Sequence, residues 1–282
     1  MIDYEKILVK FEEFPTLPTI YVTLSEVMDN PRSTPDDASD VISRDQSAAA
    51  KILKVSNSAI YGLQGKVSNI SDAIKYIGFQ EVKNLVFALS VIKIFDFKSG
   101  GILNPIDLWK HSLGVGVITR LMGKLTGAVN IENYFLAGIL HDIGKLFLYK
   151  YFPSDYTDVV YYANKNKLTL REAEKTVLGI TNSVLGGLIA EKWKLPVSIR
   201  DTIQNHDSGI SDSDTNHLTG CVHIANIAAC MLGLGFNNKH GYIPRPNKLV
   251  WKNLDLPEKA FSKLLPNIMQ DYEISVNLMI KS

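Results

Sequence analysis

The sequence predicts an all-α protein of two packed helical subdomains, residues 1–100 and residues 101–282. Apolar residues recur at spacings of three and four through most of the chain, and residues that start or stop helices stand at the ends of those stretches. No stretch alternates apolar and polar residues for long enough to predict a strand. With 282 residues, of which 46% are hydrophobic, the chain is long enough for one large core or two smaller ones.

The first hundred residues predict a series of short helices. Phe14-Pro-Thr-Leu-Pro predicts an extended break, because a residue that precedes proline disfavours the helical conformation. Thr34-Pro35 predicts a helix start, and Asp45 and Ser71-Asp72 predict two further caps. We expect no catalytic cluster in this half. The expected helices cover residues 7–14, 20–28, 35 onwards, 46–57, 73–77 and 82–95.

The second half predicts a longer series of helices after a hinge at Ser99-Gly-Gly-Ile-Leu-Asn-Pro. A polar loop with two prolines is expected at residues 237–247. Helices are expected at residues 107–125, 133–150, 154–166, 169–178, 183–193, 197–206 and 218–234, and two more from about Pro257 and Pro266.

The helix expected over residues 133–150 carries the chemistry, because His141 and Asp142 interrupt its apolar sequence. A helix that is apolar nearly all round is buried, and buried polar groups must be paired or must coordinate a ligand. Adjacent residues lie about 100° apart on a helix, so both side chains can face one ion, and Lys145 covers the next turn. Gly138 and Gly144 allow a neighbouring backbone to approach closely.

The His-Asp pair has two interpretations, a metal site or a buried hydrogen bond that ties two helices together. His111 lies on the preceding helix, and His206, followed by Asp207, is a candidate ligand near a later helix end. We expect a core or capping role for His223. His217 and His240 have polar neighbours in the sequence and are expected to be solvated.

The order of these residues resembles the HD superfamily of metal-dependent phosphohydrolases, whose pattern is a His, a His-Asp pair and a distant Asp. The resemblance is closer to one branch, the HDOD family, and it covers nearly the whole chain. It implies a helical fold and a role in bacterial signal transduction. The matching blocks are Phe14-Pro-Thr-Leu-Pro and residues 42–45, 50–62, 70–79, 109–112, 140–145 and 193–196.

The superfamily's metal site carries over to this sequence in part. The final Asp of the pattern falls at Asn226, and Asn182 and Asn205 stand where better-equipped relatives carry histidines. An amide oxygen can touch a hard cation but adds no charge, so the site loses a fixed negative charge. Lys145 matches the lysine that meets a substrate phosphate, which makes it the catalytic candidate. The candidate ligands of a divalent ion (Fe, Mn, Mg or Zn) are His111, His141, Asp142, His206 and Asn226.

The HD-GYP branch, which cleaves cyclic dinucleotides, matches less well. The loop contains His240-Gly-Tyr-Ile-Pro, in which Ile243 interrupts the Gly-Tyr-Pro triplet. The segment also follows the helix of Asn226 instead of directly following the region of His206. The sequence therefore departs from that branch twice.

Composition bears on partners and compartment. The formal net charge of +1 and the pI of about 7.7 give no basic excess, so no nucleic acid is expected as a partner. The apolar stretches fall short of the ~20 residues of a membrane span, and the N-terminus has acidic residues where a signal peptide is basic and then apolar. Cys221 and Cys230 would lie roughly 13 Å apart on a helix, too far for a disulfide. We expect a cytoplasmic protein.

Two functions follow from these patterns. The leading hypothesis is a non-catalytic signalling or regulatory module that binds a protein partner, through its N-terminal helices, or a small ligand. The rival is a metal-dependent phosphohydrolase that acts on a nucleotide or phosphodiester. A structural metal or haem-like ligand held by the histidines is a third possibility, for which the sequence has no motif.

Overall fold

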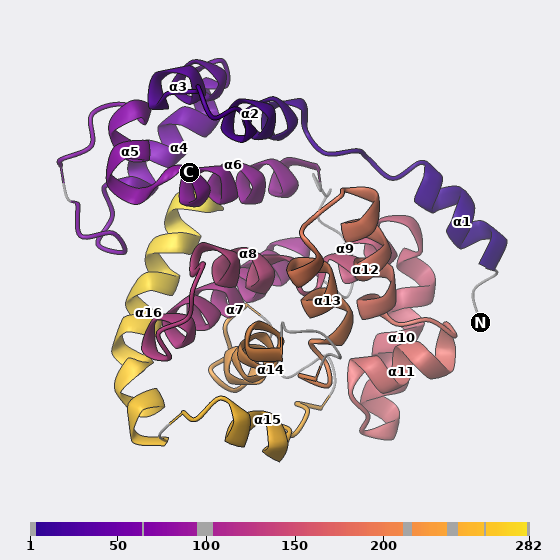
Figure 1. The fold of residues 1–282 in the computed structure, drawn as a ribbon. Helices are drawn as coiled ribbons and strands as arrows, with labels where there is room; N and C mark the ends of the chain where they lie inside the picture. The colour runs from indigo at the N-terminus through magenta and orange to yellow at the C-terminus, as the bar shows by residue number, and fades with distance from the viewer. Residues whose placement is uncertain are drawn as a thin grey trace. The chain divides into compact units, whose positions relative to one another are not determined.

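The protein is helical, as the computed structural model in Figure 1 shows for residues 4–63, 65–94, 104–210, 216–235, 242–256 and 258–280. No strand occurs in these ranges, and the all-α prediction is confirmed. The chain divides into two compact units. Unit 1 comprises Met1–Thr16 and Phe97–Ile268, and unit 2 comprises Leu17–Asp96 and Met269–Ser282. The division at residue 100 stays a prediction, and the two units differ from it at both ends of the chain.

Unit 2 forms around the mostly buried helix α6. Thr34 and Asp37 form a capping box at the start of α3, and the Asp45 carboxylate accepts a hydrogen bond from Ala48 N at the start of α4, so both predicted caps are confirmed. Asn69, not Ser71, caps α5. Its helices are α2 (Thr19–Asp29), α3 (Pro35–Ser43), α4 (Gln46–Ser56), α5 (Ile70–Ile77) and α6 (Phe79–Ile94), with α6 packed against α2, α4 and α5.

Unit 1 holds the longer helices. In it α7 packs against α8 and α14, and α12 packs against α9 and α13. The last helix, α16 (Glu258–Met279), begins in unit 1 and ends in unit 2. The others are α1 (Tyr4–Glu12), α7 (Pro105–Leu125), α8 (Glu132–Leu140), α9 (Ile143–Tyr151), α10 (Pro153–Asn166), α11 (Leu170–Val177), α12 (Asn182–Lys192), α13 (Val197–Asn205), α14 (Asn216–Met231) and α15 (Lys248–Asn253).

The N-terminal segment is fastened to unit 1 by aromatic stacking and hydrogen bonds. Phe14 stacks on Trp193, with ring centroids 5.6 Å apart, and meets Phe147 edge-on. The indole Nε1 of Trp193 donates to Pro15 O (2.9 Å). The extended break predicted after Phe14 is present, and it lets the chain leave α1 and begin α2.

The predicted helix over residues 133–150 is wrong in one respect, because it is two helices that meet at His141 and Asp142. Asp142 has φ −103° and ψ 19°, and the imidazole Nδ1 of His141 donates to the carbonyl of Gly138 (2.7 Å), in competition with the backbone. The close approach predicted for the glycines is confirmed. A Cβ on Gly138 would lie 2.5 Å from Cα of Gly116, and one on Gly144 would lie 1.9 Å from the carbonyl oxygen of Asn182.

The C-terminal region also differs from the prediction. A single helix, α16, contains Pro266 in its interior, where we expected a helix start. A helix can pass through a proline at the loss of one backbone hydrogen bond. The sequence also missed α15, which Asn247 caps by accepting from Leu249 N. Pro257, most of the hinge at residues 99–105 and His240 in the polar loop lie outside the described residues.

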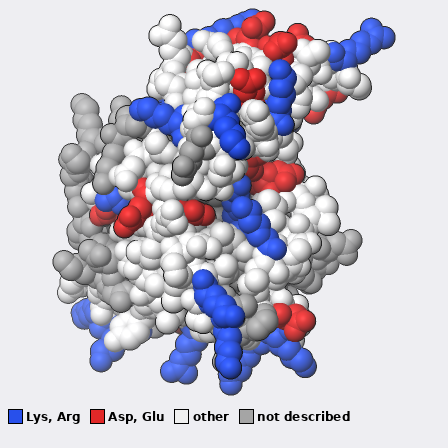
Figure 2. All heavy atoms as spheres, turned by 90° about the vertical axis from the view of Figure 1, so that its left-hand side faces the viewer, with Lys and Arg blue, Asp and Glu red and all other residues white. Residues whose placement is uncertain are grey.

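Surface charge and helix hydropathy describe the outside of the molecule. On the face in Figure 2, Lys and Arg side chains lie down the middle and along the lower edge with uncharged surface between them, and acidic side chains lie at the top and toward both sides. None of the described helices is long and apolar enough to cross a membrane. Cys221 and Cys230 are both free thiols, as their spacing predicts.

Candidate metal centre and the adjoining cavity

The structure brings all six predicted site residues together in the core of unit 1. His111 comes from the middle of α7, and Asn226 from α14, which packs against it. His206 follows the last residue of α13. His141 and Asp142 occupy the break between α8 and α9, and Lys145 lies in the first turn of α9. The helix break therefore turns two adjacent side chains toward one point.

Two imidazoles are fixed in the same way. The Nδ1 atom of His141 donates to Gly138 O (2.7 Å), and the Nδ1 atom of His206 donates to Ile203 O (2.8 Å). Each Nε2 atom is buried without a hydrogen bond and faces the carboxylate of Asp142, at 3.1 Å from Oδ2 for His141 and 3.6 Å from Oδ1 for His206. Because Nδ1 keeps its hydrogen, Nε2 needs either a second proton or a metal ion between it and the carboxylate.

The two oxygens of Asp142 have different surroundings. Oδ2 accepts from Lys145 Nζ at 2.7 Å, whereas Oδ1 is buried without a hydrogen bond. Burial alone would raise the pKa of Asp142, but the charges of His141 and Lys145 outweigh it and hold that pKa well below 3.8. Burial likewise favours neutral Lys145, yet the carboxylate of Asp142 raises its pKa. Asp142 and Lys145 are therefore a charged pair, in which the carboxylate is fully buried and the lysine side chain is 13% exposed.

His111 and Asn226 bond to each other. The Nε2 atom of His111 donates to Oδ1 of Asn226 at 2.9 Å and lies 3.9 Å from Oδ2 of Asp142. Burial, and then the charge of His141, lower the pKa of His111 to about 3, so its imidazole is neutral. In this arrangement the amide that replaces a carboxylate is satisfied without a cation.

These residues fit a divalent cation. Ligand atoms that share one ion at ~2.1 Å lie roughly 3.0 to 3.4 Å apart. The imidazole Nε2 atoms lie 3.1, 3.6 and 3.9 Å from the carboxylate oxygens of Asp142, near and somewhat beyond that range. One ligand atom each of His111, His141 and Asp142 lies within 4.8 Å of the others. The unpartnered Nε2 atoms and Asp142 Oδ1 give the ion nitrogen and oxygen donors, which suit Zn, Fe and Mn.

The other predicted polar residues take structural roles. Asn205 donates to Asp201 O on its own helix (2.9 Å). His223 donates from Nδ1 to His206 O (2.9 Å) and accepts from Asn247 N at Nε2 (3.1 Å), which matches its expected core or capping role. The expectation of a solvated His217 is wrong.

His217 is half-buried because it shares a hydrogen bond with a tyrosine of α8. Its Nδ1 atom lies 2.8 Å from the hydroxyl of Tyr134, and burial lowers its pKa. Its polar sequence neighbours gave no sign of this contact between helices.

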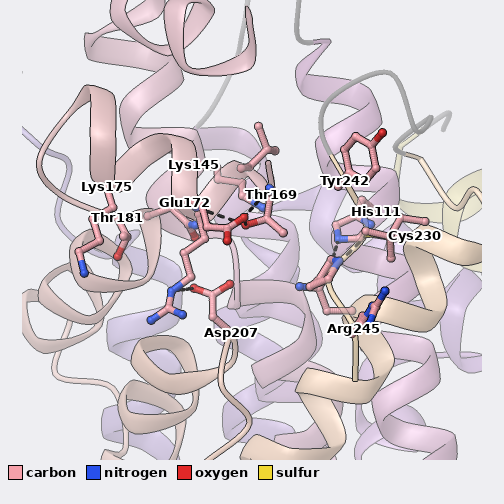
Figure 3. Close-up of a pocket in the computed structure, with 16 residues that line it drawn as sticks. His111, Lys145, Thr169, Glu172, Lys175, Thr181, Asp207, Cys230, Tyr242 and Arg245 are labelled. Carbon is pink, nitrogen blue, oxygen red and sulfur yellow. Dashed lines mark hydrogen bonds and ion pairs between the residues drawn. The ribbon is translucent and has the colours of Figure 1, made fainter. Parts of the chain in front are cut away.

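A cavity of about 510 Å³ adjoins the centre. Figure 3 shows the residues that line it. Lys145, His111 and Asn226 line it, but His141, Asp142 and His206 do not. Its charged side chains are Lys145, Arg171, Lys175, Arg245, Glu172 and Asp207, four cations against two carboxylates.

A buried carboxylate that the sequence motifs did not indicate, that of Glu174, lies close to the cavity lining. Glu174 accepts from the hydroxyl of Tyr156 (2.9 Å) and from the backbone of Asn182 (2.8 Å), and burial raises its pKa to about 7. Its position could have revealed it, since Glu174 lies four residues from Leu170 and from Leu178 on the apolar face of α11. Asp207 was noted only as the neighbour of His206, and Arg171 not at all.

Comparisons with known proteins agree with this fold. A family model of the HDOD domain matches residues 14–208. A solved HDOD domain protein from Geobacter sulfurreducens is 27% identical, with a TM-score of 0.81, and the match covers 99% of this chain and 100% of that chain.

Two more distant structures support the fold alone. A candidate phosphohydrolase from Shewanella amazonensis SB2B is 23% identical (TM-score 0.73, 97% of this chain and 98% of that chain). A candidate signal transduction protein from Marinobacter aquaeolei VT8 is 20% identical (TM-score 0.74, 95% of this chain and 60% of that chain).

A curated relative, a Treponema pallidum (strain Nichols) protein described as uncharacterized, is 22% identical over 203 residues. The match covers 70% of this chain but 38% of that protein, so the chain spans well under half of its relative's length. The family model covers more than half of the chain, and the structural match extends over nearly all of it. The chain belongs to the HDOD domain family.

Proposed function

We propose that this HDOD chain is a regulatory module of bacterial signal transduction, which holds one divalent cation in its core and binds a small anionic ligand without hydrolysing it. One observation carries the proposal: the His-Asp pair and His206, which a hydrolase would need at an open metal, are closed off from the cavity. His141, Asp142 and His206 are at most 1% exposed, and none of them lines the cavity.

Lys145 separates the cavity from the carboxylate. Its ammonium group lines the cavity and also pairs with Asp142 Oδ2 at 2.7 Å. A phosphate in the cavity would therefore meet the ammonium of Lys145 before it could approach Asp142. A hydrolytic metal ion supplies an activated water at an open coordination position that faces the substrate. This arrangement favours binding over hydrolysis.

The charge of the centre supports the same conclusion. Asp142 and Lys145 cancel one another, and Asn226 supplies an amide where the superfamily pattern has a carboxylate. A site with fewer fixed negative charges holds a hard cation more weakly. The neutral imidazoles of a metal site would then carry more of the binding, through nitrogen rather than oxygen.

The cavity suits an anion. Its four cationic side chains outnumber its two carboxylates. Glu172 is engaged in the cap of α11, where it accepts from Thr169 N at 2.8 Å. Lys175 and Arg245 lie on opposite sides of the cavity, and Tyr242 presents a half-exposed ring at its edge (Figure 3). A ligand with negative charge at separated positions matches this distribution.

The test combines a binding probe with a turnover assay. We expect inorganic pyrophosphate to bind the wild-type chain, and the double substitution Lys175→Gln and Arg245→Gln to weaken that binding at least tenfold. Lys252→Gln, which removes a lysine of α15 outside the cavity, is the matched control and should leave it unchanged. Bis(p-nitrophenyl) phosphate with Mn²⁺ should not be turned over. Metal-dependent turnover that His141→Ala abolishes would overturn the proposal.

The rival function, a metal-dependent phosphohydrolase, has one observation in its favour. The Nε2 atoms of His141 and His206 are buried without hydrogen bonds, and their Nδ1 atoms bond to carbonyls in the manner of metal ligands. Asn226→Asp separates the two functions, because it restores the carboxylate of the superfamily pattern. Metal-dependent hydrolysis that appears only in this variant would identify the native centre as a binding site that has lost catalysis.

A further inference from the structure

His206 lies between two carboxylates. Its Nε2 atom is 3.6 Å from Oδ1 of Asp142 and 3.5 Å from Oδ1 of Asp207. The side chain is 1% exposed, Nδ1 is committed to Ile203 O, and Nε2 has no hydrogen bond. An unpartnered buried nitrogen that faces two negative groups marks the place where a positive charge is missing.

The oxygens of Asp142 indicate the side on which that charge belongs. Oδ2 is occupied by the ammonium of Lys145, whereas Oδ1 has no hydrogen bond and faces His206. His111, on the other side, already bonds to Asn226. Two unpartnered atoms, Oδ1 of Asp142 and Nε2 of His206, thus face each other, and a further unpartnered atom, Nε2 of His141, lies 3.1 Å from Oδ2.

We propose that Asp207 is the second carboxylate of the cation centre, so that the ion is held by His141, Asp142, His206 and Asp207. This inference rests on the cation in the proposed function and adds a ligand that the superfamily pattern does not contain. Two imidazoles and two carboxylates make a donor set of the kind that Zn, Fe and Mn accept. Four protein ligands close the coordination shell, which agrees with a centre that does not hydrolyse.

Arg171 competes with the cation for Asp207. Its Nε atom pairs with Oδ2 of Asp207 at 3.3 Å, and its side chain is 55% exposed, against 17% for Asp207. Asp207 lines the cavity, where Figure 3 shows its ion pair, and its Oδ1 atom faces the buried His206. Asp207 therefore connects the cavity with the closed centre, and an ion can reach His206 along it.

The experiment measures Mn²⁺ affinity of the full chain after chelator treatment, by equilibrium dialysis with detection of free Mn²⁺ by electron paramagnetic resonance. Asp207→Asn should weaken binding at least tenfold, because it removes a charged ligand without changing its shape. Arg171→Gln should strengthen binding about threefold at low salt, because a competing positive charge is lost. Asp201→Asn, in the preceding helix α13 and paired with Arg200, is the matched control and should change nothing.

The outcomes separate this inference from the proposed function. If the wild-type chain binds Mn²⁺ and Asp207→Asn binds it equally well, Asp207 is no ligand and this inference alone is overturned. If the wild-type chain binds no Mn²⁺ while pyrophosphate still binds, the cation centre is overturned and the ligand cavity stands. Thermal unfolding of Asp207→Asn, with its partly exposed side chain, should match the wild type without metal, so that weaker binding reports a lost ligand.

Discussion

The two sides of the Asp142 carboxylate differ in how their polar atoms are satisfied. On the Oδ2 side, Lys145 donates at 2.7 Å and His111 bonds to Asn226, so the protein itself supplies the partners. On the Oδ1 side, neither Oδ1 nor the Nε2 atom of His206 has a hydrogen bond. Oδ2 thus has a cationic partner in Lys145, although the Nε2 atom of His141 beside it has no hydrogen bond, whereas Oδ1 has no partner at all. The difference teaches that Oδ1, and not Oδ2, is the carboxylate oxygen left for a further partner.

The largest expected effect on stability comes from breaking the ion pair between Asp142 and Lys145. Asp142→Asn leaves the charged Lys145 buried without its partner, which should lower the free energy of unfolding by about 3 to 5 kcal/mol. Urea unfolding of the metal-free chain measures it. The double substitution with Lys145→Met should recover much of that loss, because no buried charge is left alone. Equal stability of Asp142→Asn and the wild type would show that the pair is not buried and charged.

Glu174 and Asp142 should respond to pH in opposite directions. Burial raises the pKa of Glu174 from 4.5 to about 7, so the folded chain binds its proton more tightly, and stability should fall by roughly 3 kcal/mol as pH rises from 4.5 past 7. The pKa of Asp142 is lowered, so its contribution is lost only as pH falls below about 4. Urea unfolding from pH 5 to 8 should show the decline, and Glu174→Gln should flatten it. A stability that rises over this range in the wild type relative to Glu174→Gln would contradict the assignment.

The contact between α9 and α12 should tolerate an added methyl group less well than the contact between α14 and α15. A Cβ at Gly144 would lie 1.9 Å from the backbone oxygen of Asn182, so Gly144→Ala should cost about 1 to 3 kcal/mol. A Cβ at Gly220 would lie 3.1 Å or more from its nearest atoms. These belong to the side chains of Val250 and Leu254, which can shift slightly. Gly220→Ala is therefore the matched control. Thermal unfolding that ranks the two variants in the reverse order would contradict the close approach.

The smallest effect belongs to the ion pair at the cavity. Arg171 and Asp207 are partly exposed, and exposed pairs contribute little, so Arg171→Gln should change the free energy of unfolding by less than about 0.5 kcal/mol. Urea unfolding of Arg171→Gln and Asp142→Asn under the same conditions compares the two changes in free energy directly. A loss of more than about 2 kcal/mol in the free energy of unfolding would show that the Arg171–Asp207 pair contributes as much as the Asp142–Lys145 pair. Arg171 could then not give up Asp207 to a cation.

Local signals predicted the helices well, and contacts between helices explain the errors. Thr34 and Asp45 cap as expected because a cap depends on residues within one turn. The break at His141 and Asp142 was missed because apolar spacing continues through it, while the cause is a hydrogen bond from an imidazole to Gly138. The predicted helix start at Pro266 was wrong for a different reason, because the proline lies inside α16 and does not end the helix there.

In the candidate site, too, local motifs were informative and contacts between elements were not predicted. The motifs led to the six residues that the structure brings together, although their roles as ligands stay a prediction. The partners of Glu174, Asp207 and Arg171 come from other elements, so spacing along the chain could not reveal them. Asp207 follows His206 directly, yet only the fold shows that its carboxylate turns back toward the imidazole of its neighbour.

The most direct test compares the metal content of two purified variants, His206→Ala and His111→Ala, with that of the wild type, all grown with iron and manganese and never exposed to chelator. If the ion lies on the His206 side of Asp142, we expect about one equivalent of metal in the wild type, its loss in His206→Ala and its retention in His111→Ala. Retention in His206→Ala with loss in His111→Ala would place the ion on the Oδ2 side of Asp142 and contradict the account.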